Sequence, residues 1–225
     1  MAKQSRQQIF QDSTRTGVRV AICVPCRDTV MAGFAFDLAK LCAYEGFRGV
    51  LAGLSIYQMP GTMIFDQRNK LAQQAIDEGA DWILWIDSDM RFPKDTLQIL
   101  LSRELPIVGV NATTRMHPVK PTSLNLEFNE EGLKKLVKVN SKGKEGLEQV
   151  MGCGFGLVLT HKDVYDKMPT PWFAFMESGV GGWIGEDIHF CAKASDYGFP
   201  TFIDHELSMH IKHIGVYEYG WDDYT

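Results

Sequence analysis

The stretch DWILWIDSDMRF, residues 81–92, places two carboxylates directly after five apolar residues, with only Ser88 between Asp87 and Asp89. Two carboxylates about 4 Å apart repel each other by roughly 4 kcal/mol at an effective dielectric near 20, so a compensating partner is expected. Side chains two residues apart on a strand point to the same side. A hard divalent cation is the natural partner for such a pair, and it can in turn hold a diphosphate. The alternative is that Asp87 caps the next turn and Asp89 is a solvated loop acid.

The run WILWI that precedes the aspartates is apolar on both faces, as a central strand of a parallel sheet must be. Ligands of open α/β sheets bind beyond the carboxyl ends of the strands. The sequence therefore predicts that Asp87 and Asp89 lie where a ligand binds.

The first half of the chain alternates between strand and helix patterns, which predicts a parallel α/β sheet. The expected strands are residues 18–25, 49–57, 81–87 and 106–111, and the expected helices are residues 34–47, 66–79 and 92–104. Asp66 is expected to cap the second helix and Gly79 to end it, and Gly46 is expected near the end of the first. Pro93 is expected at or near the first position of the third helix.

The pattern changes after Ala112. Short β-type runs at residues 122–128, 136–140, 148–152 and 155–160 predict antiparallel strands added to the sheet. A cluster of lysines here is most simply a solvated hairpin face; its members are Lys134, Lys135, Lys138, Lys142 and Lys144. The run MESGVGGWIGED holds four glycines and is expected to be a mobile loop, followed by a helix that ends at Gly198.

The composition is that of a globular protein with one sizeable core: 225 residues, 45% hydrophobic, with a formal net charge of -5. This mild acidity argues against a protein built to neutralise nucleic-acid phosphates. The five cysteines are scattered and odd in number, which fits a reducing cytoplasm rather than a disulfide framework. No apolar run is long enough to span a membrane, so a soluble, cytoplasmic protein is expected.

Several motifs follow one another between Arg19 and Gly215: VPCRD, RNKLAQQAIDEGADWILWIDSDMRF, GCGFG, GEDIHFCAKASDYGF and a late HIG. Their order resembles the GT-A superfamily of glycosyltransferases, particularly its family 2-like members. The resemblance implies a GT-A fold: a Rossmann-like α/β domain with a mostly parallel central sheet, helices on both faces and a small antiparallel acceptor-side extension. It also implies a hexosyl- or related transferase that uses a nucleotide sugar, with Mn²⁺ or Mg²⁺ held by the DxD motif on the donor diphosphate.

The resemblance further implies how the chain is divided. A single domain is expected over residues 17–225, after a mobile segment at residues 1–16. Within it, the donor half covers about residues 17–115 and the acceptor half about residues 116–225.

Donor-side positions are carried over from the same motifs. Asp87, Ser88 and Asp89 match the DxD, and Asp89 is the expected direct metal ligand. The loop near the nucleotide base is matched by Pro25, Arg27 and Asp28, and the RN before the DxD strand is matched by Arg68 and Asn69. A helix start lies at the ligand edge of an α/β sheet, where an arginine fork can meet a phosphate or a base carbonyl. The alternative for Arg68 is an exposed helix residue paired with Asp66 or Asp81.

Acceptor-side positions follow the glycine-rich run. Glu186 and Asp187 match the ED at the start of an acceptor-side helix. Transfer onto a hydroxyl needs a base, and Asp187 is favoured as base or acceptor-orienting residue, with Glu186 second. The alternative is that both acids only cap the helix and complement its dipole. Trp183 is expected either to stack on a sugar ring or to anchor the loop.

The late HIG motif contains His213, which matches the third protein ligand of the metal. His210 is the fallback, because residues three apart on a strand point to opposite faces. An imidazole ligand suits manganese better than magnesium.

Two rival function classes stay open. A nucleotide-sugar-binding module would keep the site without transfer, and a phosphatase of the haloacid dehalogenase type also carries a DxD after a strand. The phosphatase pattern wants Thr or Val where this chain has Arg91. UDP is the first expectation for the nucleotide and GDP the second. The acceptor is a saccharide, a protein, a lipid-linked sugar or a modified nucleic-acid base, and the oligomeric state is left open.

Overall fold

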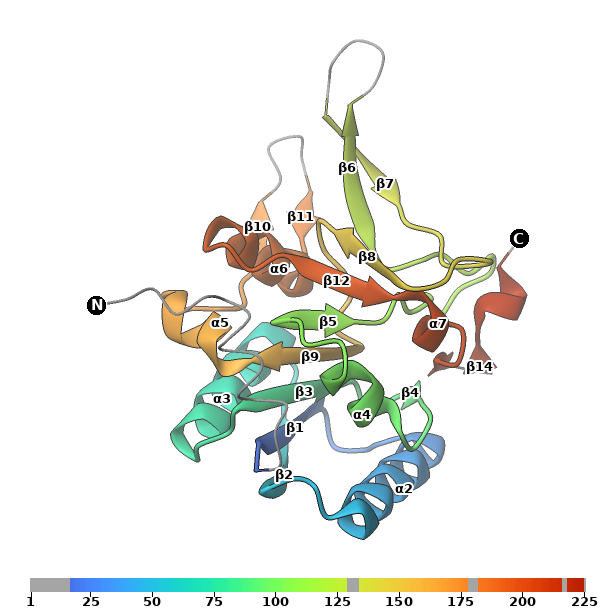
Figure 1. Ribbon diagram of the computed structural model, residues 1–225. Helices are drawn as coiled ribbons and strands as arrows, with labels where there is room; N and C mark the ends of the chain where they lie inside the picture. The colour runs from blue at the N-terminus through green and yellow to red at the C-terminus, as the bar shows by residue number, and fades with distance from the viewer. Residues whose placement is uncertain (1–16, 129–133, 178–181, 216–217, 225) are drawn as a thin grey trace.

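The centre of the protein is a mixed α/β sheet. The computed structural model describes residues 17–128, 134–177, 182–215 and 218–224. Within these ranges the main sheet has seven strands in the order β2-β1-β3-β9-β5-β12-β8 (Figure 1). The bounds are β1 Arg19–Cys26, β2 Gly53–Pro60, β3 Trp82–Ile86, β5 Ile107–Gly109, β8 Leu147–Val150, β9 Leu157–His161 and β12 Thr201–Asp204. Strands β9 and β8 run against the other five.

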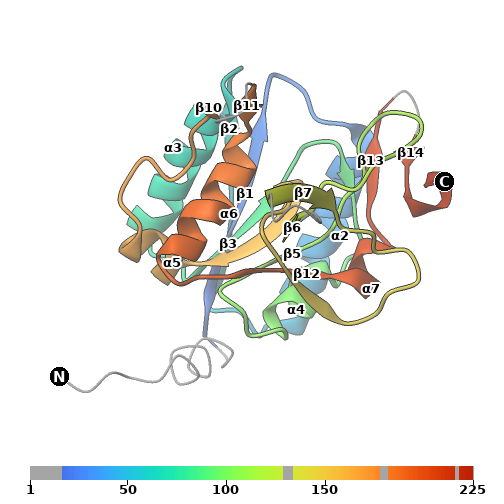
Figure 2. The same cartoon turned by 90° about the horizontal axis from the view of Figure 1, so that it is seen from above.

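Helices cover both faces of this sheet. One face carries α3 (Ile64–Asp77), α5 (Lys162–Lys167) and α6 (Glu186–Asp196), and the other carries α2 (Ala32–Arg48), α4 (Thr96–Leu101) and α7 (His205–Ser208). Figure 2 shows α3 and α6 side by side on one face, with α2 and α4 on the other. The predicted α/β class, with a mostly parallel central sheet between helices, is confirmed.

The alternation of side chains along the central strands creates the two cores. In β1, Val20, Ile22 and Val24 pack into the core under α2, while Ala21 and Cys23 pack into the core under α3 and α6. Strand β3 is buried along its whole length and serves both cores in the same way. A strand of this kind must be apolar on both faces, as WILWI is.

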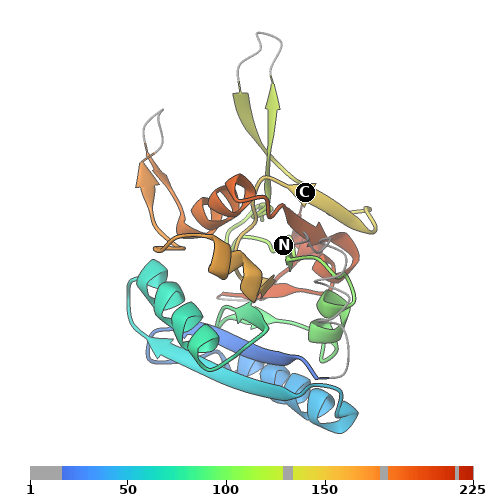
Figure 3. The ribbon, with the colours of Figure 1, turned by 60° about the vertical axis from the view of Figure 1, so that its left-hand side comes forward.

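Smaller sheets lie beside the main sheet. The pair β6 (Leu124–Phe128) and β7 (Lys134–Lys138) forms a hairpin, and so does the pair β10 (Met176–Glu177) and β11 (Trp183–Ile184). Both hairpins project on the same side of the molecule (Figures 1 and 3). Strand β13 (Lys212–Ile214) pairs with β14 (Glu218–Tyr219) and with β4 (Met90–Arg91), which follows the two aspartates.

The position of β9 differs from the prediction of strands added to the sheet. This strand lies in the centre, fully buried and antiparallel to both β3 and β5. Local sequence patterns report which residues are buried but not which strands pair, so the pattern of LVLTH could not reveal its neighbours.

Helix α2 ends at Arg48, two residues after Gly46, which therefore lies near the helix end as predicted; Gly49 follows with a φ of 62°, the left-handed conformation that glycine adopts most easily. Two predicted helix starts were wrong. Helix α3 begins at Ile64, and Asp66 pairs with Lys70 within the helix instead of capping it. Helix α4 begins three residues after Pro93. The glycine-rich run forms β10, β11 and the start of α6 in its described part, while residues 178–181 and 1–16 lie outside the described residues.

The strands bring three segments to one edge of the sheet. Strands β1, β3 and β5 share a direction, so the residues that follow each of them lie at the same carboxyl edge, where the start of α3 also lies. In the part of the chain that the structure describes, no helix is both long enough and apolar enough to cross a membrane.

Candidate functional site

The turn of residues 87–89 after β3 is fixed by main-chain hydrogen bonds from three other segments. Asp87 N donates to Gly156 O (3.0 Å), Met31 N donates to Ser88 O (3.1 Å), and Ile214 N donates to Asp89 O (2.8 Å). The first contact comes from the glycine-rich GCGFG, the second from the segment after β1, and the third from β13. Asp87 and Asp89 therefore stand on a backbone that three other regions of the chain hold in place.

Arg68 joins Asp87 to Glu186 at the start of α6. The residue is 1% exposed, with Nη2 donating to Asp87 Oδ1 (2.9 Å) and Nε donating to Glu186 Oε1 (3.3 Å). It lies 5.6 Å and 5.5 Å from the ring centroids of Trp85 and Phe155. Arg68 is thus neither an exposed helix residue nor a partner of Asp66 or Asp81. Its Nη1 is buried without a hydrogen-bond partner among the described residues.

Burial and neighbouring charges shift the pKa values of this cluster. Burial alone would lower the pKa of Arg68, but the carboxylates of Asp87, Glu186 and Asp187 raise it, so the guanidinium stays charged. Burial raises the pKa of Asp87, and the charge of Asp89 adds to this, against the opposing effect of Arg68. Burial also raises the pKa of Asp187 to about 6, with a further contribution from Glu186. One arginine therefore faces more negative charge than it can neutralise.

Asp89 has two basic side chains beside it. Asp89 Oδ1 lies 3.3 Å from His213 Nε2, and Asp89 Oδ2 lies 2.8 Å from Arg115 Nη1. Burial would raise the pKa of Asp89, but the hydrogen bond with His213 and the charges of His213 and Arg115 lower it. The same carboxylate raises the pKa of His213 in spite of burial. The exposed side chain of His210 has no part in this arrangement of Asp89 with its two basic side chains.

The chemistry of these residues fits a divalent cation. Within residues 17–128, 134–177, 182–215 and 218–224, no three His, Cys, Asp or Glu side chains are gathered as a preformed metal site. Two ligands nevertheless face each other, because His213 Nδ1 donates to Thr113 O (2.9 Å) and so turns Nε2 toward Asp89. Asp87 is the third candidate ligand and the second carboxylate, and it also accepts a hydrogen bond from Arg68. Metal binding by Asp87, Asp89 and His213 stays a prediction.

The acceptor-side residues have different surroundings. Glu186 is buried and bound to Arg68, whereas Asp187 Oδ1 accepts from Ile188 N (2.7 Å) within its own helix turn. Trp183 precedes them on β11 and is 76% exposed. Glu186 therefore holds Arg68 in place, and a catalytic role of Asp187 stays a prediction.

An apolar groove of about 1090 Å³ lies between α3 and the segment around β10 and β11. Its aromatic lining is Phe65, Trp172, Phe173, Phe175 and Trp183. Asn69 also lines it, but its amide is occupied: Nδ2 donates to Phe65 O and Phe173 O, and Oδ1 accepts from the main-chain N–H groups of Trp172 and Phe173. Asn69 therefore holds the groove wall in place. Both hydrogens of its amide are already used within the protein, so neither is left to bind a nucleotide sugar.

The residues that are expected to contact the nucleotide lie at the end of β1 and directly after it. Pro25 is buried within β1, while Arg27 and Asp28 are exposed after it. Gln67 Nε2 donates to Cys26 O and to Met59 O, which ties the ends of β1 and β2 together beside the start of α3. Donor binding by Pro25, Arg27, Asp28 and Ser88 stays a prediction.

Sequence reasoning missed two residues of this region. Arg115 follows β5 at the carboxyl edge, so the rule that identified Asp87 could have identified it too. Lys138, assigned to a solvated hairpin face, is close enough to Asp187 for the two charges to interact; burial lowers the pKa of Lys138 and Asp187 opposes that effect. No local pattern indicated this pairing.

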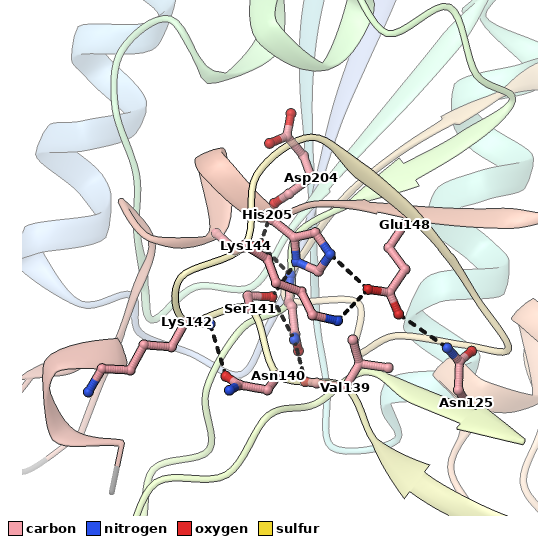
Figure 4. Close-up of polar contacts among 11 residues, drawn as sticks. Asn125, Val139, Asn140, Ser141, Lys142, Lys144, Glu148, Asp204 and His205 are labelled. Atoms are coloured by element: carbon pink, nitrogen blue, oxygen red, sulfur yellow. Dashed lines mark hydrogen bonds and ion pairs between the residues drawn. The ribbon is translucent and has the colours of Figure 1, made fainter. Parts of the chain in front are cut away.

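A second polar cluster has residue types used in nucleophilic catalysis. Ser141 Oγ lies 2.9 Å from His205 Nδ1, and His205 Nε2 lies 3.0 Å from Glu148 Oε2 (Figure 4). Ser141 is fully buried, however, and its Oγ also accepts from Asn111 Nδ2 (2.9 Å). A nucleophile must reach its substrate, so this cluster is a structural network.

No family model matches the chain, so the comparisons with known proteins do not show its family. They do show similarity to one curated protein whose name refers to a polysaccharide. The mannan polymerase complex subunit MNN9 of Candida albicans is 25% identical over 175 residues, which are 70% of this chain and 46% of the relative. The chain thus spans about half the length of that relative.

Solved structures add evidence on the fold alone. A197 from STIV has a TM-score of 0.57 at 14% identity, covering 88% of this chain and 86% of that one. A glycosyltransferase involved in the glycosylation of the major capsid of PBCV-1 has a TM-score of 0.33 at 15% identity, covering 68% of each chain, which is too weak to support an inference.

Proposed function

We propose that this protein transfers a sugar from a nucleotide-diphosphate sugar to an acceptor hydroxyl, with a divalent cation on the diphosphate. One observation carries the proposal: Arg68 hydrogen-bonds to Asp87 of the DxD turn and to Glu186, which lies 118 residues farther along the chain. A carboxylate pair suited to a cation is thereby joined to Glu186, which precedes the proposed base Asp187 at the start of α6. The motif order and the 25% identity to a mannan polymerase complex subunit support this reaction class.

The cation would be held by Asp89 and His213, with Asp87 beside them. When bound, Mn²⁺ or Mg²⁺ supplies positive charge to the leaving diphosphate. The imidazole of His213 favours manganese. UDP is the nucleotide we expect first and GDP second, with the exposed Arg27 and Asp28 near the base.

Asp187 is the proposed base. The acceptor oxygen attacks the anomeric carbon of the donor sugar while the bond from that carbon to the diphosphate oxygen breaks. The acceptor proton goes to Asp187, and the nucleoside diphosphate leaves. A pKa of about 6 keeps Asp187 mostly ionised at neutral pH while leaving it basic enough to take a proton. Trp183, exposed before this helix, offers a flat apolar face to a sugar ring.

Thermal-shift titration with UDP, GDP, CDP and dTDP, each with Mn²⁺ or with EDTA, tests the donor site. A ligand that binds only the folded state raises the unfolding midpoint by mass action. We expect one nucleotide to stabilise the protein with Mn²⁺ and not with EDTA, and Asp89→Ala to remove this effect. Asp166→Ala, on the exposed side of α5, is the matched control and should keep it.

Stabilisation by no nucleotide at millimolar concentration would refute the donor site, and an unchanged response of Asp89→Ala would refute the metal assignment. Turnover separates an enzyme from a nucleotide-sugar-binding module. Release of the nucleoside diphosphate from the sugar donor is the readout, and a protein that binds the donor without releasing it is the binding module.

A further inference from the structure

Arg115 pairs with Asp89, the carboxylate that a cation would need. Its Nη1 lies 2.8 Å from Asp89 Oδ2, on the side of Asp89 away from His213 Nε2, which lies 3.3 Å from Oδ1. Both oxygens of Asp89 therefore have a nitrogen of a basic side chain beside them in this structure. A divalent cation bound by Asp89 would lie a few ångströms from the guanidinium, and like charges at that range repel each other. Arg115 and a cation compete for Asp89.

The backbone around Arg115 is fixed while its side chain reaches solvent. Thr114 N donates to Lys120 O (2.9 Å), and Thr113 forms an isolated bridge with Pro121. Thr113 O also accepts from His213 Nδ1, which fastens this segment to β13. The side chain of Arg115, in contrast, is 53% exposed. A long side chain on a fixed backbone can exchange partners without a change of fold.

Arginine has a second natural partner at this edge of the sheet. A guanidinium has five N–H donors in a planar fork that matches phosphate oxygens as well as carboxylate oxygens. Asp89 would hold the cation, and the cation would in turn bind the diphosphate of the nucleotide sugar, an anion that Arg115 beside Asp89 could bind as well. The diphosphate would then neutralise the charge of Arg115 in place of Asp89.

We propose that Arg115 is an exchange residue, which neutralises Asp89 in the empty site and turns to the donor diphosphate when the cation takes Asp89. This inference rests on the proposed function. It makes cation and nucleotide binding mutually favourable, because the cation alone displaces Arg115 without giving it a new partner, whereas the diphosphate provides one. Such coupling is reciprocal between the two ligands.

The test compares wild type, Arg115→Ala and Arg115→Lys. Free Mn²⁺ is followed by electron paramagnetic resonance, and UDP and GDP are titrated calorimetrically with and without Mn²⁺. For Arg115→Ala we expect Mn²⁺ alone to bind about fivefold tighter, because a like charge is removed, and the nucleotide to bind about tenfold weaker with Mn²⁺ present. Arg115→Lys should fall between the two. Arg48→Ala, which removes the same charge at the end of α2, should change neither affinity.

Opposite shifts of the two affinities are the signature, since a purely structural role would weaken both. If Mn²⁺ binds wild type through Asp89 but no tighter to Arg115→Ala, or if nucleotide affinity is unchanged, the exchange is refuted while the proposed function stands. If Asp89→Asn binds Mn²⁺ as wild type does, the metal assignment itself fails and the exchange fails with it.

Discussion

Two polar clusters of this protein place acids next to basic side chains, yet they differ in how completely their groups are paired. The edge cluster consists of Arg68, Asp87, Glu186 and Asp187, and the His205 cluster consists of Asn111, Ser141, Lys144, Glu148 and His205 (Figure 4). In the His205 cluster, Glu148 has Lys144, His205 and Asn125 as partners, and the hydrogen bonds with Lys144 and His205 lower its pKa against the effect of burial. In the edge cluster, Arg68 Nη1 has no partner among the residues that the structure describes, and burial raises the pKa of two acids.

The difference separates two uses of buried polar groups. A network in which every charged group has a partner stabilises one arrangement of the chain. A network with unneutralised carboxyl groups is less stable by itself and is ready for a ligand or a proton, which is why perturbed pKa values gather at functional sites. Substitutions in the edge cluster should therefore affect activity or charge balance, and substitutions in the His205 cluster should affect stability alone.

The largest expected effect is that of Asp187→Asn on turnover. Loss of a general base lowers the rate by about 10²–10⁴-fold. Stability should not fall, because a neutral amide replaces a buried carboxyl group whose pKa is already raised to about 6. Release of UDP or GDP from the sugar donor measures the rate, and urea unfolding measures the stability. A variant with wild-type turnover would remove Asp187 from the chemistry.

Arg68→Met tests the charge balance of the edge cluster. Asp87 and Glu186 lose their shared cation, and breaking a buried ion pair by removing one partner costs about 3–5 kcal/mol of unfolding free energy. Adding Asp87→Asn to Arg68→Met should restore part of this loss. Urea unfolding of the single and double variants gives both values; a single variant destabilised by less than about 1 kcal/mol would show that Arg68 is not needed for this balance.

Glu148→Gln is the matched change in the His205 cluster. The amide keeps the shape but weakens the charge-assisted bonds to Lys144 and His205, so unfolding free energy should fall by about 1–3 kcal/mol. The melting temperature should fall by about 2–4 °C per kcal/mol in a chain of this size. Turnover of the folded variant should equal that of wild type. A tenfold loss of turnover with unchanged melting temperature would place function in the His205 cluster and reverse the comparison.

The smallest expected effect is on the pH profile. Because its pKa is raised to about 6, Asp187 takes up a proton at a higher pH than an ordinary aspartate does. The proposed base acts only when it is ionised, so the rate should fall as the pH drops through about 6. At pH 5 the rate should be about tenfold below its neutral plateau. Glu148 has a lowered pKa and stays ionised through this range, so Glu148→Gln should show the same acidic limb. A profile without that limb would contradict the role of Asp187.

The sequence could predict the fold class and part of the site because both depend on local patterns. The apolar run WILWI identified the central strand, and its end located Asp87 and Asp89 at the ligand edge. Order along the chain could not reveal that β9 enters between β3 and β5, nor that Arg68 bonds to both Asp87 and Glu186. Those contacts arise from long-range packing, which no periodicity of 2 or 3.6 residues records.

The central place of β9 has a consequence for how the chain folds during synthesis. Strands β3 and β5 do not pair with each other, so each keeps an open edge until β9, which ends at His161, has left the ribosome. A nascent chain that ends near residue 115 would present one open edge of β3 and both edges of β5 to other chains, which favours aggregation. Residues 17–115, the predicted donor half, are thus not an autonomous folding unit, and the long sequence separation between β3 and β9 favours slow folding.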